Sequence, residues 1–244
     1  MRPGPRADRA PADRAPADPA PAGVAPVPAA AAGPLLPRDF FARPALAVAG
    51  ELLGCVLAHH TGAGLTAVML TEVEAYEGAV DPASHAYRGQ TARNAVMFGA
   101  PGHAYVYFTY GMHFCVNLVC LPPGTASAVL LRAGRVIEGV PLAATRRSAG
   151  RNGARPGRMP ERELARGPAR LCQALGIGRE LDGADVCDPA SPLRIQAGRA
   201  GPAPGISRGP RVGISVAADR PWRFWLTGDP TVSSYRPYTP RVRK

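Results

Sequence analysis

The sequence has little lysine, no paired cysteines and no long apolar run. Lys244 is the only lysine, so a lysine nucleophile that forms a Schiff base is not expected. The five cysteines are odd in number and show no C-x-x-C spacing, which argues against both a disulfide framework and a zinc site. No segment approaches the eighteen or so apolar residues that span a bilayer, and no compact apolar run marks a signal peptide. We therefore expect a cytoplasmic protein with no membrane association and no metal.

The first 37 residues differ in composition from the rest of the chain. They contain 12 alanines and 10 prolines, and the run ADRAP occurs twice in succession. Such a segment has almost nothing apolar to bury. We expect residues 1–37 to be a disordered Pro/Ala-rich leader and residues 38–240 to form one folded domain.

Arginine supplies nearly all of a large positive charge. The chain has 29 basic and 18 acidic residues, a formal net charge of +11, and the leader holds only four Arg and three Asp. A folded domain with this excess is typical of proteins that bind a polyanion, although a base composition that favours Arg would give the same count. Residues 146–162 are rich in Arg and Gly, which predicts a flexible Arg-rich loop.

Periodic and alternating apolar residues predict an α+β domain. Residues 42–54 have helical periodicity behind a possible cap at Asp39, and residues 167–177 have it with Pro168 in the first turn. Strand-like runs occupy residues 55–60, 65–76, 103–110, 113–120, 127–134, 211–216 and 222–228. We expect a mixed, largely antiparallel curved sheet flanked by helices.

Two acidic residues share one face of the strand predicted for residues 65–76. Alternation places Glu72, Glu74 and Tyr76 together. Two carboxylates at this spacing could form the acid and base of a hydrolase, but acids on an exposed strand face are more often only solvated. His85 follows in a loop rich in Gly, Pro and Ser. The presence of Tyr76 and His85 near the two acids favours a catalytic site over solvated carboxylates.

Three of the seven tyrosines fall within one predicted hairpin, joined through Gly111 and Met112. Parity puts Tyr105 and Tyr107 on one face and leaves Tyr110 near the tip. Core packing is the ordinary explanation for such a cluster. In a basic protein, however, tyrosines also stack on bases, and a residue at a hairpin tip can wedge into a base stack. The combination indicates a flipped nucleotide with a plug in the gap it leaves.

Asn117 and Arg132 each interrupt an otherwise apolar strand. A buried Asn must find partners, either structural or on a ligand. A buried Arg is most simply explained by a structural ion pair with a nearby Glu. The residues alone leave both alternatives open.

Several of these motifs occur in the order found in one protein family. Between about Phe40 and Ser233 the chain contains FFARPALAVAGELLG, TEVEAYEG, DPASHAYRG, QTARNAVMFGAPGHAYVYFTYGMHFCVNL, AVLLRA, GPARLCQALGI and RVGIS. In these segments it resembles the alkyladenine (3-methyladenine) DNA glycosylases, monofunctional enzymes of base excision repair. The resemblance implies a monomer that flips a damaged purine out of double-stranded DNA and hydrolyses its N-glycosidic bond, with no cofactor and no lyase step. The substrate class would be 3-methyladenine, 7-methylguanine, hypoxanthine and ethenoadenine.

The same resemblance implies a role for each candidate residue. Glu74 would be the general base that activates water, and Arg132 would help to hold that water. Tyr76, His85 and Tyr107 would form the walls of the base pocket and stack on the extruded purine. Asn117 would contact the edge of the purine and so select among bases. Tyr110 would fill the space left in the duplex. Backbone groups of residues 211–214 are expected near the water or the base. Apart from the resemblance, the positive charge of the domain leads us to expect phosphate contacts from Arg93, Arg146, Arg147 and Arg170.

Two other functions remain possible at this point. The chain could bind nucleic acid without turnover, although the set of Glu74, Arg132 and Tyr107 argues against this. It could also hydrolyse small nucleosides with Glu72 and Glu74 as a pair. The basic domain and a tyrosine at a hairpin tip argue against that alternative, because a free nucleoside needs no wedge.

Overall fold

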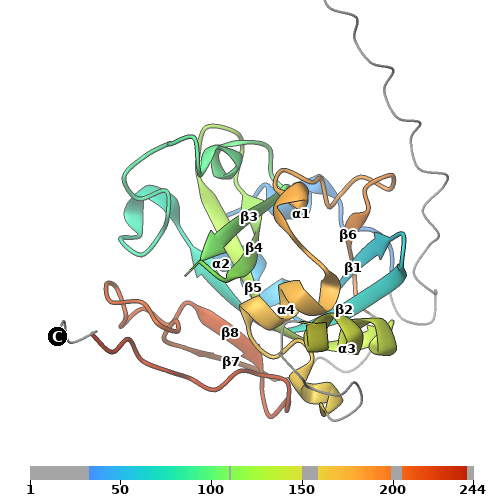
Figure 1. Cartoon of the computed structure of the whole chain (residues 1–244). Helices are drawn as coiled ribbons and strands as arrows, with labels where there is room; N and C mark the ends of the chain where they lie inside the picture. Colours follow the sequence, from blue (N-terminus) through green and yellow to red (C-terminus); the bar gives the residue numbers. More distant parts are fainter. Residues whose placement is uncertain (1–32, 110, 150–158, 199–204, 241–244) are drawn as a thin grey trace, which may run out of the picture.

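The computed structural model describes residues 33–109, 111–149, 159–198 and 205–240. Its centre is one curled antiparallel sheet with the strand order β3-β4-β5-β2-β1-β6 (Figure 1). β8 pairs with β2 on a second branch, and β7 pairs with β8. The strands are β1 (Val56–Thr61), β2 (Gly64–Tyr76), β3 (Ala104–Thr109), β4 (His113–Cys120), β5 (Ser127–Glu138), β6 (Leu193–Gln196), β7 (Ile206–Gly209) and β8 (Arg223–Leu226).

The α+β prediction is confirmed, with one refinement. Every strand pairing among the described residues is antiparallel, so the sheet is not mixed. The predicted hairpin is present as β3 and β4, with Thr109 opposite His113. Its tip, Tyr110, lies outside the described residues.

A bulge divides the long central strand β2 into two halves. The register between β2 and β5 shifts on both sides of Glu72. As a result Leu70 packs in the same core cluster as Val73 and Ala75, although strict alternation would put Leu70 on the face of Glu72. An extra residue in one strand of an antiparallel pair reverses the alternation in this way. The bulge therefore turns apolar residues into one core and leaves Glu72 and Glu74 beside β5.

The helix predicted for residues 42–54 is present in shorter form as α2 (Ala45–Glu51), and a separate short helix, α1 (Arg38–Phe41), precedes it. Pro44 stands immediately before α2, where its ring suits a helix start but not a helix interior. Asp39 lies within α1 and caps neither helix. Ala45, Val48 and Leu52 form the fully buried face of this segment, whereas Leu46 and Leu53, which the periodicity predicts on the apolar face, are only half-buried against the core.

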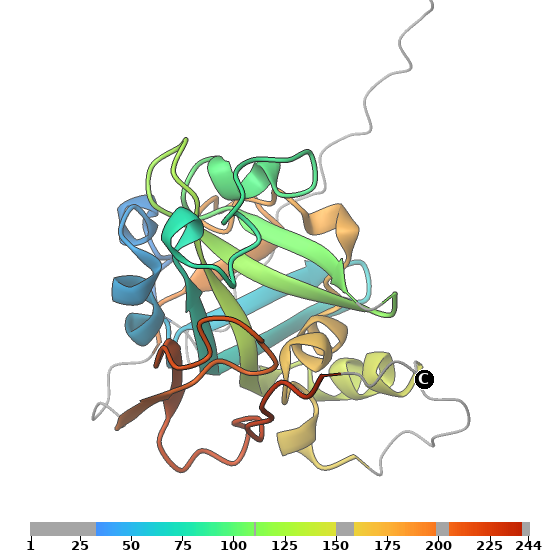
Figure 2. The same ribbon diagram turned by 90° about the vertical axis from the view of Figure 1, so that its left-hand side faces the viewer.

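Helices α3 (Val140–Ala149) and α4 (Pro168–Leu175) pack against each other, and α4 also contacts β4 and β5. Figure 2 shows them on a different side of the sheet from α1 and α2. The prediction for α4 is confirmed, including Pro168 in its first turn, and the structure adds that Gly176 ends the helix in the left-handed conformation. None of the helices among the described residues is long and apolar enough to cross a membrane.

Three predicted boundaries are wrong. Residues 146–149 belong to α3 rather than to a loop, while residues 150–158 lie outside the described residues. Residues 211–216 form turns, and the strand in this region is β7, which ends before them. The ordered domain also begins earlier than residue 38, because Leu36 is buried in the core and Leu35 bridges to Gln196. Residues 1–32 of the predicted leader lie outside the described residues.

This early start gives a prediction about truncation. Removal of residues 1–32 is expected to leave stability and activity unchanged, because their composition offers little apolar surface to bury. Removal of residues 1–37 is expected to lower the free energy of unfolding by about 2 kcal/mol, because the Leu36 side chain leaves the core. Urea unfolding of the full chain and both truncated chains compares them. Equal stability of all three proteins would contradict the assignment of residues 33–37 to the domain.

Candidate active site

A cavity of about 340 Å³ opens at the end of the sheet where β2, β3, β4 and β5 present polar and aromatic side chains. The first turn of α4 and residues 212–214 complete its wall. The lining residues on which the site depends are Glu74, Tyr76, His85, Tyr105, Tyr107, Cys115, Asn117 and Arg132. Sequence positions from residue 74 to residue 214 thus meet in one pocket.

Glu74 is fully buried in this pocket, and each of its carboxylate oxygens has a defined partner. Oε1 accepts a hydrogen bond of 2.7 Å from the backbone N–H of Val212 and lies 3.2 Å from Nη1 of Arg132. Oε2 accepts a hydrogen bond of 2.9 Å from the hydroxyl of Tyr76. A carboxylate with two hydrogen-bond donors, one ion pair and no solvent exposure is fixed in position.

Glu72, which does not line the cavity, binds Arg132 and is itself bound by Arg223. Nε of Arg132 donates to Oε1 of Glu72 at 2.8 Å, and Nε of Arg223 donates to the same oxygen at 2.7 Å. Ser233 adds its backbone N–H at 2.7 Å and its hydroxyl at 2.9 Å. Glu72 is fully buried and does not line the cavity. The two acids therefore differ in role, since Glu72 anchors Arg132 and Glu74 faces the pocket.

The electrostatics agree with this division. Burial alone would raise the pKa of Glu72, but the cations of Arg132 and Arg223 outweigh it and hold that pKa below its ordinary value. For Arg132 burial acts to lower the pKa, and the charges of Glu74 and Glu72 raise it overall. Burial and the neighbouring Glu74 raise the pKa of the Tyr76 hydroxyl, so Tyr76 stays a neutral donor.

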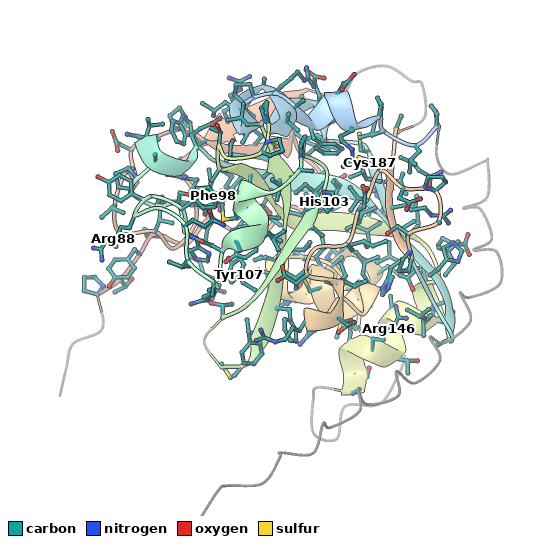
Figure 3. All side chains as sticks on the ribbon, turned by 90° about the horizontal axis from the view of Figure 1, so that it is seen from above. Arg88, Phe98, His103, Tyr107, Arg146 and Cys187 are labelled. Atoms are coloured by element: carbon teal, nitrogen blue, oxygen red, sulfur yellow. The ribbon has the colours of Figure 1, made fainter. Side chains whose placement is uncertain are left out.

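Aromatic rings form one wall of the cavity. The rings of Tyr105 and Tyr107 are stacked with centroids 5.5 Å apart, as their parity in β3 predicts. The ring of His85 meets Tyr107 edge to face at 4.6 Å, and its Nδ1 lies 3.2 Å from the Tyr105 hydroxyl. Burial, with a smaller effect of Arg93, lowers the pKa of His85 and favours the neutral imidazole. Figure 3 shows Tyr107 among the side chains of β3.

Asn117 and Cys115 contribute from β4. Nδ2 of Asn117 donates to the backbone oxygen of Tyr105 at 3.3 Å, and Asn117 is buried at the cavity wall. Burial raises the pKa of the Cys115 thiol, which therefore stays protonated. The amide of Asn117 and the imidazole of His113 are polar groups that β4 places at the cavity wall.

The comparison with protein families decides the assignment. A family model described as "Methylpurine-DNA glycosylase (MPG)" matches residues 39–230, which is most of the chain. The chain belongs to this family. The resemblance stated from the sequence motifs is thereby confirmed, over nearly the same span.

Three relatives of this methylpurine-DNA glycosylase chain carry the name "Putative 3-methyladenine DNA glycosylase". The one from Streptomyces avermitilis is 56% identical over 211 residues, covering 86% of this chain and 95% of the relative. Those from Leifsonia xyli subsp. xyli and Frankia casuarinae are 51% and 52% identical over 203 and 209 residues. Each of the latter alignments covers 82% of this chain and 92% of the relative.

Two of the arginines predicted to contact phosphate have hydrogen-bond partners within the folded domain. Nη1 of Arg146 donates to the backbone oxygen of Leu175 at 2.8 Å, and Nη2 donates to the hydroxyl of Thr61 at 2.9 Å. Arg147 is buried and donates to Oε1 of Gln173. Figure 3 shows Arg146, which belongs to α3, apart from Tyr107. Phosphate contact at Arg146 and Arg147 stays a prediction that this geometry does not favour.

The other two predicted phosphate contacts flank the cavity. Arg93 is exposed, donates to the backbone oxygen of Phe108 at 3.2 Å and acts electrostatically on His85. Arg170 lies in the first turn of α4, directly after the cavity-lining Ala169, and forms a 2.6 Å ion pair with Glu163. Its side chain is 46% exposed, so the guanidinium remains accessible to a polyanion.

Sequence reasoning missed Arg223 and Ser233 and did not single out Val212. Arg223 had a usable signal, since it interrupts the apolar strand β8 in the same way as Arg132 interrupts β5. The backbone N–H of Val212 had none, because a main-chain donor leaves no trace in residue type. Residues 211–214 were predicted near the site as a group, and Val212 is the member that bonds Glu74.

Proposed function

We propose that this chain is a monofunctional DNA repair glycosylase that excises damaged purines from duplex DNA, with Glu74 as the base that activates water. The observation that carries the proposal is the buried Glu74 carboxylate at an aromatic-walled cavity, held by Arg132 and the Val212 N–H. The family assignment and the names of the relatives support the same activity.

The chemistry needs a water molecule close to Glu74 and to C1′ of the flipped nucleotide. The N-glycosidic bond breaks as the sugar gains oxocarbenium character, the water oxygen forms the new bond to C1′, and its proton passes to the Glu74 carboxylate. The purine leaves with the electron pair of the broken bond, and the product is an abasic site. Arg132, Val212 and Tyr76 keep the Glu74 carboxylate in place for this step.

Stacking on Tyr76, His85 and Tyr107 would bind the extruded purine, and the Asn117 amide would screen its edge. Aromatic faces attract a cationic ring such as 3-methyladenine or 7-methylguanine. A neutral His85 suits this task, because an imidazolium would repel the cationic base. A normal purine would leave a polar group of the pocket unpaired, which costs about 1 to 3 kcal/mol.

The absence of a nucleophilic lysine in the sequence argues for simple hydrolysis without a lyase step. We propose that Tyr110, at the tip of the β3–β4 hairpin, fills the space that the flipped nucleotide leaves. Arg93 and Arg170, on two sides of the cavity, would contact the phosphates. The partner would be double-stranded DNA with a damaged purine, bound by one copy of the chain.

The phosphate contacts give a prediction about salt dependence. Arg93→Ala and Arg170→Ala are each expected to reduce the slope of log K against log salt for undamaged duplex by about 1, because each contact releases condensed counterions. Filter binding at several salt concentrations measures the slope. Arg43→Ala is the control, since Arg43 is an exposed arginine paired with Glu51 on α2. A slope unchanged in both variants would contradict these contacts.

Base release from a duplex tests the proposed function against its two alternatives. Under single-turnover conditions the chain is expected to release 7-methylguanine or hypoxanthine from duplex oligonucleotides and to leave alkali-labile abasic sites. The free nucleosides are expected to be poor substrates. Duplex binding with no release of any of these bases would favour a silent binding protein, and comparable cleavage of free nucleosides would favour a nucleoside hydrolase.

A further inference from the structure

A buried arginine lies directly behind the cavity wall formed by Tyr76. The guanidinium carbon of Arg211 is 4.5 Å from the centroid of the Tyr76 ring and 5.0 Å from the Trp222 ring. Arg220 also lies over the Trp222 ring, at 4.6 Å. Cations and aromatic rings therefore alternate in a stack that runs from the segment just before β8 to the cavity wall on β2, and β8 and β2 pair side by side (Figure 1).

Asp81 neutralises the arginine in this stack. Its two carboxylate oxygens accept hydrogen bonds of 2.5 and 2.8 Å from the two terminal nitrogens of Arg211. Nη1 of Arg211 also donates to the backbone oxygen of Ala75 at 3.0 Å. Both side chains of the pair are fully buried. The charge next to the Tyr76 ring is thus a closed ion pair with no net charge.

The position of the pair matters because Tyr76 lines the cavity and Arg211 does not. Arg211 covers one face of the ring, which leaves the other face to the cavity. A cation on one face of an aromatic ring opposes the binding of a second cation on the other face, since both draw on the same π electrons. Asp81 removes most of this opposition by placing a negative charge beside Arg211.

We propose that the Asp81–Arg211 pair is a specificity-determining element that keeps the Tyr76 ring able to bind cationic purines. This inference rests on the proposed function and deepens it. A purine stacked on Tyr76 would lie roughly 8 Å from the guanidinium, adding a stacking separation of about 3.5 Å to the observed distance. At that separation, an uncompensated charge on Arg211 would repel a cationic base and leave a neutral base nearly unaffected.

The test compares two lesions of different charge in the same duplex. Single-turnover half-saturation and maximal rate are measured for 7-methylguanine, which is cationic, and for hypoxanthine, which is neutral. Asp81→Asn leaves the arginine charge uncompensated and is expected to lower the preference for 7-methylguanine about tenfold. Most of this change is expected as a higher half-saturating concentration for the 7-methylguanine duplex. Arg211→Gln leaves the carboxylate and is expected to raise the preference. The double variant Asp81→Asn/Arg211→Gln is expected to return within about twofold of the wild-type ratio.

Asp185→Asn is the matched control, because Asp185 forms an ion pair with Arg38 away from the cavity. Figure 3 shows Cys187, its near neighbour in sequence, apart from Tyr107. A ratio within twofold of wild type in both single variants, or in whichever of them folds, overturns the inference, even if both rates fall together. If the wild-type chain releases neither base, the proposed function fails and this inference fails with it. If wild type and the variants release both bases at the same ratio, only this inference fails and the proposed function stands.

Discussion

Glu74→Gln is expected to reduce single-turnover base release by about 10²- to 10⁴-fold, the usual contribution of a general base, while duplex binding persists. The amide has the shape of the carboxylate but cannot take the proton from water. Its oxygen can still accept from Val212 and Arg132, and its NH₂ group can donate to the Tyr76 hydroxyl, which then acts as acceptor. The pocket should therefore keep its geometry and lose only its base.

The measurement is release of hypoxanthine from duplex oligonucleotide, with alkali to reveal abasic sites and gel shift to record binding. Glu51→Gln serves as the control for loss of an acidic charge, because Glu51 is exposed on α2 and paired only with Arg43 among the contacts of its side chain described here. Release by Glu74→Gln within tenfold of wild type would show that Glu74 is not the base. Loss of both release and binding would instead indicate that the pocket had collapsed.

Most of the strands could be predicted from local patterns in the sequence, whereas the pocket could be predicted only from the resemblance to the family. Alternation in β3 correctly places Tyr105 and Tyr107 on one face. The family motifs then brought residues from four strands to a single pocket, and the structure does place Glu74, Asn117 and Arg132 together. A pattern of period two needs only neighbouring residues to be read.

The parts that were missed depend on contacts between distant segments. Nothing near Glu72 in the sequence indicates that Arg223 and Ser233 bind it from more than 150 positions away. Arg146 and Arg147 look like part of a solvated basic run, but they lie on α3, and the neighbouring helix α4 offers them the carbonyl of Leu175 and the amide of Gln173 as partners. Charge alone cannot show whether an arginine faces solvent or a neighbouring helix.

The bulge in β2 is a similar case. Strict alternation places Leu70 with Glu72, and only the register against β5 reveals the extra residue. Without this bulge, the apolar residues before and after it would lie on opposite faces of the sheet. The same shift gives Glu72 and Glu74 different surroundings, because Glu72 binds Arg132 and Arg223 while Glu74 lines the cavity.

Glu72→Gln is accordingly expected to act on stability more than on chemistry. Replacement of the shared carboxylate leaves Arg223 and Arg132, both buried, with one acid fewer, and an uncompensated buried charge typically costs about 3 to 5 kcal/mol. Urea unfolding should show a fall in the free energy of unfolding of this size. Base release at low temperature should fall less than in Glu74→Gln, because Arg132 keeps its contact with Glu74.

A second substitution distinguishes an anchor from a second catalytic acid. In the double variant Glu72→Gln/Arg223→Gln the number of buried charges is again balanced, so part of the lost stability and of the lost release should return. A catalytic carboxylate could not be replaced in this way, because no change at Arg223 restores a proton acceptor. Loss of release in the double variant as deep as in Glu74→Gln, in a protein that is folded by circular dichroism, would therefore assign Glu72 to the chemistry and return the two acids to a working pair.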